Sequence, residues 1–304
     1  MHDDLWRIGR RLAVLALLLA LAAGDAAAQL VVPGRRLFLL STEHCDLYYP
    51  AELAAEASRL AALADSTYAE LARRFPAGVR EDRRISVLLA GGVSSLDGWF
   101  NAFPSDRIVL RLAPARLGSD LGSFDDGLRA VFAHELAHEL SLGTRSRFWS
   151  FWAAVLGDTV EPCRWTAPDS LIEGAAIISE GRGGSGRAKD PLAAALVKQD
   201  ILEGRYKDFW QAAGAWDAYP FGRLPYVYGG LFSARLLERF GEERYAELWR
   251  RLGEGNALAG VEGAAFLKGA FEASYGESLD EAWAEFRDSI AIREPVAMET
   301  RRLA

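Results

Sequence analysis

Cysteine, methionine and histidine are scarce in this chain of 304 residues, which contains two, two and four of them. The two cysteines, Cys45 and Cys163, do not stand in the C-x-x-C spacing of a thiolate metal site. They could form one disulfide in an oxidising compartment, but the sequence does not give the distance between their Cα atoms. The sequence therefore leaves their pairing open.

An excess of positive charge is also lacking. The formal net charge is −7, which argues against a nucleic-acid partner, since such a partner favours a basic face. No polybasic stretch points to an anionic membrane surface. Half of the residues are hydrophobic and a quarter are charged, which is the balance of an ordinary globular protein.

No apolar run is long enough to cross a bilayer comfortably. The longest, residues 12–23, follows three arginines within residues 7–11 and precedes three alanines at 26–28. This order is typical of a signal peptide, here residues 1–28, cleaved before Gln29. The alternative is an uncleaved N-terminal anchor. We expect an exported protein, periplasmic or extracellular, whose mature chain has no membrane span.

The most informative feature that the chain does contain is an H-E-x-x-H motif, His134-Glu135-Leu136-Ala137-His138, in an apolar, helix-forming run. Residues four apart share one face of a helix, so both histidines can offer imidazole nitrogens to one metal ion. Glu135 lies about 100° round the helix, where it can reach a metal-bound water without ligating the metal. The motif predicts a zinc site; the alternative is a pair of ordinary helix histidines.

A catalytic zinc needs a third protein ligand, with the fourth position left for water. The other histidines, His2 and His44, lie in the leader and in an early turn. Glu173 is an acid in an otherwise apolar helix-forming segment, and a buried carboxylate without a partner is costly. We therefore predict that it joins His134 and His138 as a ligand of Zn²⁺; the alternative is a half-exposed helix acid.

The apolar patterns predict an α+β fold with a small strand-rich N-terminal half and a mainly helical C-terminal half. Strands are expected at residues 36–40, 46–49, 84–90 and 106–112, with a helix over 51–75 and the motif helix starting near 124–126. Further helices are expected at 192–203, 228–240, 242–252, 263–275 and 279–290, after a glycine-rich turn at 181–186. The aromatic run at 148–152 is expected in the core or in a lid rather than in a membrane-dipping loop.

These motifs resemble those of gluzincin metallopeptidases, in which the H-E-x-x-H helix is followed by a helix with a Glu-Gly pair, here Glu173-Gly174. The sequence is most similar to peptidase-MA-like domains of exported bacterial proteins, which often precede TolB-type β-propellers. The resemblance extends to a Y-x-x-G segment at 225–232 and to closing helices at 271–286. It implies a zincin-like metallopeptidase domain over 29–292, with halves 29–145 and 146–292, followed by a tail at 293–304.

The resemblance also implies a function, that of an exported zinc-dependent endopeptidase acting on peptides or proteins. Glu135 would be the general base, and Tyr226, in a P-Y-x-x-G context, would stabilise the oxyanion. Tyr228 is the rival for that role, and either tyrosine could instead be a packing aromatic. The strand near 108–112 is expected to bind extended peptide as an edge strand. The G-x-M-E-N exopeptidase signature is absent, which argues against an aminopeptidase.

Two other functions remain open at this stage. One is a non-catalytic, peptidase-like binding or assembly module of the bacterial envelope, with a β-propeller or an envelope protein as its partner. The other is a hydrolase of the same fold that acts on a non-peptide substrate.

Overall fold

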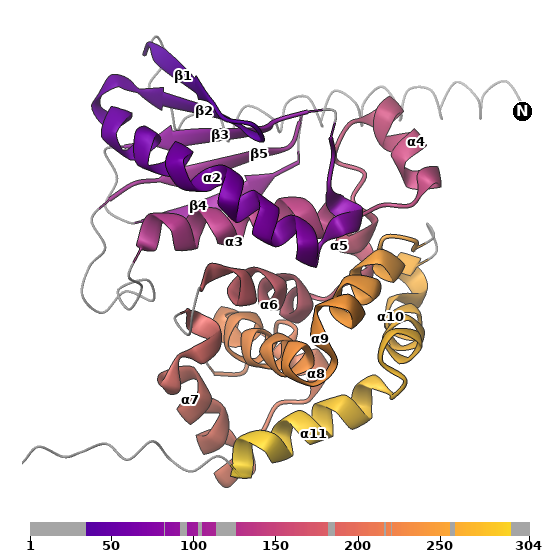
Figure 1. Cartoon of the computed structure of the whole chain (residues 1–304). Helices are drawn as coiled ribbons and strands as arrows, with labels where there is room; N and C mark the ends of the chain where they lie inside the picture. The colour runs from indigo at the N-terminus through magenta and orange to yellow at the C-terminus, as the bar shows by residue number, and fades with distance from the viewer. Residues whose placement is uncertain are drawn as a thin grey trace, which may run out of the picture.

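The computed structural model describes residues 35–81, 83–91, 96–102, 105–113, 126–181, 186–215, 217–219, 221–255 and 259–292. The predicted signal peptide and the tail at 293–304 lie outside these residues, as does most of the glycine-rich turn. Within this part of the chain the predicted α+β architecture is confirmed. A five-stranded sheet forms in the N-terminal half, and helices dominate the C-terminal half (Figure 1).

The sheet mixes parallel and antiparallel strands in the order β1-β2-β3-β5-β4. β1 and β2 form an antiparallel hairpin, β2, β3 and β5 run parallel, and β4 is antiparallel to β5. The strands are β1 (Leu37–Ser41), β2 (Cys45–Pro50), β3 (Ile85–Ala90), β4 (Asp97–Asn101) and β5 (Arg107–Arg111).

One strand, β4, was not predicted, and its presence corrects the prediction of the edge strand. The expectation that residues 108–112 form an edge is wrong, because β5 lies between β3 and β4, and β4 is the last strand. The sequence of β4, Asp-Gly-Trp-Phe-Asn, lacks the alternation of apolar and polar residues that marks a strand with one buried face. In the structure every residue of β4 is half-buried.

Two helices pack on the sheet. α2 (Ala54–Arg74) begins after the short turn η2 (Ala51–Leu53) and buries residues at helical spacing, among them Ala57, Leu60 and Leu71. α3 (Gly127–Leu142) carries the H-E-x-x-H motif and is buried on all sides between the sheet and α6 (Asp169–Glu180). Asp126 caps α3 by accepting a hydrogen bond from the backbone N–H of Arg129. The motif helix is therefore central to the fold (Figure 1).

The C-terminal half contains the helices that the sequence predicted, with one difference. The two helices expected at 228–240 and 242–252 form a single element, α9, which bends at Gly241, where φ is +79°. Short turns connect the longer helices: η3 (Pro76–Gly78), η4 (Arg187–Lys189), η5 (Phe221–Arg223) and the π-helical η6 (Pro225–Gly229). The remaining helices are α5 (Pro162–Thr166), α7 (Pro191–Leu202), α8 (Phe209–Ala212), α9 (Gly230–Leu252), α10 (Ala259–Tyr275) and α11 (Leu279–Ile292).

An aromatic cluster joins the two halves into one core. Phe75, at the end of α2, makes edge-to-face contacts with Tyr245 and Trp249 of α9. All three side chains are almost completely buried. Aromatic side chains of this size contribute much of the apolar area that a core removes from water, so this cluster helps to fix α9 against the sheet-bearing half.

The aromatic run at 148–152 lies in α4 (Arg147–Leu156), which is mostly exposed. The expectation that this run belongs to the core is therefore wrong, because only Trp149 of the helix is buried. Among the described residues, no helix is both long enough and apolar enough to cross a membrane.

The cysteines are not paired. Cys45 and Cys163 are both buried and present free thiols, so the disulfide that the sequence left open is not formed. Burial raises the pKa of Cys45 to about 12 and also raises the pKa of Cys163. Neither thiol therefore has the lowered pKa and the exposure of a reactive cysteine.

Candidate metal centre

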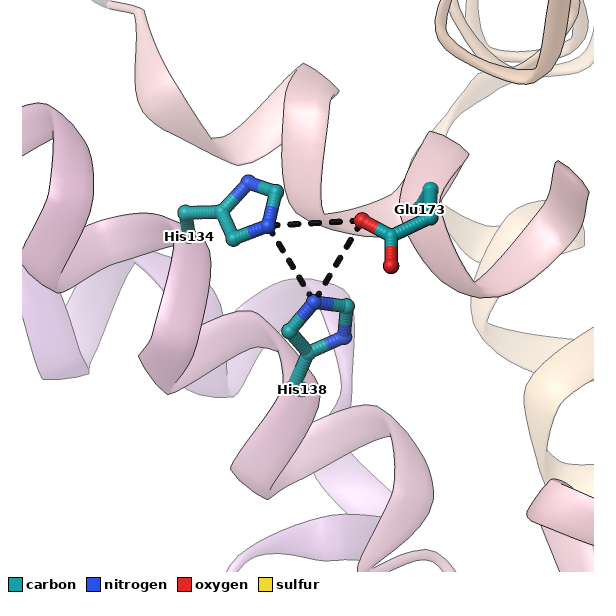
Figure 2. A group of neighbouring side chains, drawn as sticks. All are labelled: His134, His138 and Glu173. Carbon is teal, nitrogen blue, oxygen red and sulfur yellow. Dashed lines mark hydrogen bonds and ion pairs between the residues drawn. The ribbon is translucent and has the colours of Figure 1, made fainter. Parts of the chain in front are cut away.

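The structure brings the three predicted ligands together. His134 and His138 lie one turn apart on α3, and Glu173 faces them from α6 (Figure 2). The two Nε2 atoms are 3.2 Å apart, and Glu173 Oε2 lies 3.4 Å from His134 Nε2 and 3.6 Å from His138 Nε2. Ligand atoms on a tetrahedral zinc with bonds of about 2.0–2.2 Å lie roughly 3.3–3.6 Å from one another. The triangle therefore has the dimensions of three ligands of one zinc ion.

A fourth side chain, Glu180, orients the first histidine. His134 Nδ1 lies 2.8 Å from Glu180 Oε1 at the C-terminal end of α6. If Nδ1–H donates this bond, Nε2 keeps its lone pair directed towards the other two ligand atoms. The side chain of Glu180 is fully buried and forms an ion pair with Arg187 of η4. The sequence motifs do not mark Glu180, although it is a second acid two turns beyond Glu173 on the same apolar helix.

His134 and Glu173 each stabilise the charged form of the other. Burial would lower the pKa of His134, but the carboxylates of Glu173 and Glu180 outweigh it and raise this pKa to about 9. Burial would raise the pKa of Glu173, but the two imidazoles hold it well below its usual range. The buried Oε2 of Glu173 has no hydrogen-bond partner in the described part of the chain. A buried anionic oxygen facing two imidazole nitrogens is a donor set that fits a divalent cation.

Glu135 lies beside this triangle on α3. Burial raises its pKa above the ordinary value, although the neighbouring imidazoles lower it, and the backbone N–H of Phe100 donates to its carboxylate. A Cβ atom on Gly98 of β4 would lie 2.9 Å from Glu135 Cγ and 3.0 Å from Val131 Cγ1. Glycine at position 98 therefore lets the edge strand lie directly against the face of α3 that carries Glu135.

The two candidate tyrosines have different surroundings. Tyr226 lies in η6, with its ring parallel to that of His134 at 6.4 Å. Its hydroxyl lies near Glu173, and burial together with that carboxylate raises the pKa of Tyr226. Tyr228 is buried elsewhere, where its hydroxyl donates to Asp200 Oδ2 at 2.7 Å and its ring packs against Trp283. The structure therefore places Tyr228 away from the triangle and Tyr226 beside it.

Glycines determine how closely α6 and η6 approach. A Cβ on Gly174 would lie 2.5 Å from Gly229 O, and one on Gly229 would lie 2.0 Å from Ser170 O. The backbones of α6 and η6 are therefore in direct contact. This contact places Glu173 of α6 near Tyr226 of η6. This contact gives the Glu-Gly pair and the Y-x-x-G segment a physical reason to occur together.

A cleft of about 470 Å³ opens beside the triangle. Of the three triangle residues only His134 lies in its lining, together with Glu135 and Tyr226, and the edge strand supplies one wall through Asp97 and Gly98. The rest of the lining consists of five apolar and four charged residues: Leu96, Val131, Ile177, Ala193, Val227, Glu180, Arg187, Asp190 and Arg223. Charged groups that converge among apolar side chains in a cleft can orient a small molecule or a peptide.

No protein-family model matches the chain. An uncharacterised protein of Treponema pallidum (strain Nichols) is 32% identical to it over 266 residues. The match covers 86% of this chain and 22% of the relative, so the chain spans about a fifth of that protein's length. Most of the sequence is thus similar to part of a longer protein, and this relative brings no known activity with it.

Proposed function

We propose that the protein is an exported zinc-dependent metallopeptidase, an endopeptidase that cleaves peptides or proteins. The observation that carries this proposal is the triangle of His134, His138 and Glu173 ligand atoms, beside a cleft that His134, Glu135 and Tyr226 line. Zinc bound by such ligands lowers the pKa of a coordinated water towards 7 and polarises a carbonyl oxygen.

The protein's own groups supply the proton transfers. Glu135 accepts the proton of the attacking water and later delivers it to the leaving amine. Its pKa is raised by burial, which makes the carboxylate a better base than an exposed glutamate. Burial and the neighbouring Glu173 raise the pKa of Tyr226, so its hydroxyl stays protonated and can donate to the oxyanion that develops on the substrate carbonyl.

The edge strand supports an extended peptide as the substrate. β4 is the last strand of the described sheet and lies against Glu135 through Gly98. An extended peptide can pair with such an edge through main-chain hydrogen bonds, which are independent of its sequence. Binding of this kind holds residues on both sides of a scissile bond, as an endopeptidase requires.

The resemblance to gluzincins supports the same function, because its motif residues are the ones that meet at the site. Export rests on the predicted signal peptide, residues 1–28. Fractionation of cells that express the chain with a C-terminal tag tests it: the processed protein should appear in the periplasm or the medium, and unprocessed protein in the cytosol would contradict export.

The activity is tested with wild type, Glu135→Gln and, as a matched control, Glu242→Gln, whose side chain pairs with Arg74 on α2. Each protein is analysed for zinc and assayed against an unfolded protein substrate. We expect about one zinc per chain in all three, and cleavage by Glu135→Gln reduced by about 10²–10⁴-fold.

Three results would contradict parts of the proposal. Equal cleavage by Glu135→Gln would show that Glu135 is not the base. Absence of bound zinc in all three proteins would contradict the proposal that the protein is a metalloenzyme. Retained zinc with no turnover of any peptide in a library would instead indicate a non-catalytic, peptidase-like module of the envelope.

A further inference from the structure

An apolar ridge lies on α4, outside the catalytic site. Phe148, Phe151, Trp152, Val155 and Leu156 follow the i, i+3, i+4, i+7, i+8 spacing of one helix face. In a globular protein such a face normally packs on the core. Here Trp152 is 38% exposed and the other four side chains are 61–63% exposed. The face therefore points to solvent.

The opposite side attaches α4 to the protein. The buried Trp149 donates its indole N–H to the carbonyl oxygen of Gly255 and contacts Trp165 of α5. α4 stands at the edge of the molecule in Figure 1. None of its residues lines the catalytic cleft, so the described structure gives no support to its being a lid.

The described charged residues at the two ends of α4 are either arginines or an acid paired with arginines. Arg145 and Arg147 are the only charged residues between Glu139 and Asp158, and no carboxylate of the described residues lies within ion-pair distance of Arg147. The nearby acids are all paired: Asp158 with Arg80 and Arg83, Glu161 with Arg164, and Glu254 with Arg250. In a chain of net charge −7, this end can approach an anionic surface with little repulsion.

The ridge is a poor match for a protein partner. Five side chains of this size expose on the order of 500 Å² of apolar surface, near the upper limit for a monomer. A protein interface of that area forms several hydrogen bonds, yet of the five ridge side chains only Trp152 has a hydrogen-bonding group, its indole N–H. A bilayer surface requires no such bonds, and tryptophan, phenylalanine and leucine form the apolar face of helices that lie at the boundary between headgroups and acyl chains.

We propose that α4 is a membrane-surface helix that docks the protein on a lipid bilayer. The helix would lie in the plane of the interface, with the five-residue ridge among the upper acyl chains. Its ten residues are too few to cross a bilayer. Arg147 faces the headgroups and gives a preference of about fivefold for anionic over zwitterionic lipid, as expected for one arginine.

The test places an environment-sensitive fluorophore on the ridge of the full chain, through Val155→Cys. The native cysteines are both buried, so the introduced thiol is labelled selectively. The dye reports on α4 itself, independently of the apolar run at residues 12–23. A matched label at Ala195→Cys, on an exposed position of α7, serves as the control.

With vesicles of phosphatidylethanolamine and phosphatidylglycerol, we expect the emission at position 155 to rise and shift to the blue, and that at position 195 to stay unchanged. Phosphatidylcholine vesicles should require about fivefold more lipid for the same response. In the labelled protein, Phe151→Glu should raise the half-saturating lipid concentration at least ~tenfold. The matched change Leu192→Glu, at an exposed leucine of α7, should have no effect.

Two results would overturn the proposal. One is an unchanged emission at position 155 with every vesicle. The other is the same blue shift without lipid as the protein concentration rises, accompanied by dimers in sedimentation, which would assign the ridge to a second copy of the chain. Because Phe151 and Val155 are exposed, circular dichroism should show that both variants fold as the wild type does.

Discussion

His134 Nδ1 lies 2.8 Å from Glu180 Oε1, on the side of the imidazole ring opposite the nitrogen that faces His138 and Glu173. The contact joins α3 to the end of α6 and fixes the orientation of the ring. Arg187 in turn forms an ion pair with Glu180. The first histidine is therefore positioned by charged groups from two other elements as well as by its own helix.

Removing this partner should weaken zinc binding. We expect Glu180→Gln to lower the zinc affinity by about 10–100-fold, the usual effect of losing an outer carboxylate that orients a ligand histidine. Competition with a chromogenic chelator measures the affinity, and Glu242→Gln is the control that should match the wild type. An unchanged affinity in a folded Glu180→Gln protein would show that Glu180 does not position the metal ligand.

Zinc binding should depend on pH through His134. Its pKa is raised to about 9, so the metal-free protein binds a proton there at neutral pH, and zinc must displace it. Zinc affinity should rise about tenfold per pH unit up to about pH 9 and level off above it. Glu173, whose pKa is lowered, is already ionised and releases no proton.

Calorimetry in buffers of different ionisation enthalpy checks this proton release. We expect about one proton from His134 per zinc at pH 7. The stability of the metal-free protein changes with pH in the opposite direction to its zinc affinity. The raised pKa of His134 stabilises the fold fully below the unfolded pKa of 6.5, and this contribution is lost as the pH rises through about 9. A zinc affinity that stays constant between pH 6.5 and about pH 9 would contradict the assignment of His134 as a zinc ligand.

Substitution of Tyr226 should affect catalysis, whereas substitution of Tyr228 should affect stability. Tyr226→Phe removes the hydroxyl at the site and should lower kcat by about 10²–10³-fold without loss of zinc. Tyr228→Phe removes a hydrogen bond to Asp200 and should lower the free energy of unfolding by about 1 kcal/mol with kcat unchanged. Steady-state kinetics and urea unfolding measure both. Full activity in Tyr226→Phe would exclude it as the oxyanion donor.

Gly98 should be required for the position of Glu135. Because a Cβ there would lie 2.9 Å from Glu135 Cγ, Gly98→Ala must displace either the carboxylate or the edge strand. We expect kcat/KM to fall by about 10–100-fold, since small misplacements of catalytic groups are costly.

A glycine of α10 provides the control for this variant. At Gly263 an added Cβ would meet nothing within 4 Å, so Gly263→Ala should leave kcat/KM unchanged and stabilise the helix by up to about 1 kcal/mol. Wild-type kcat/KM in Gly98→Ala would show that the close contact does not position the base.

The sequence by itself determined the local features of this protein. The spacing of four residues puts His134 and His138 on one helix face, and the apolar surroundings of Glu173 mark it as a carboxylate that needs a partner. Apolar patterns also predicted four of the five strands and most of the helices, because each pattern depends on the period of its own segment.

Tertiary structure decided what depends on contacts between distant segments. β4 could not be predicted because it is half-buried along its whole length, and only the packing of η6 distinguishes Tyr226 from Tyr228. Glu180 meets His134 only because α6 crosses α3. The sequence shows an aromatic run at 148–152, but only the structure reveals that its helix, α4, leaves most of that run outside the core, because sequence patterns do not reveal which side of a helix the rest of the chain covers.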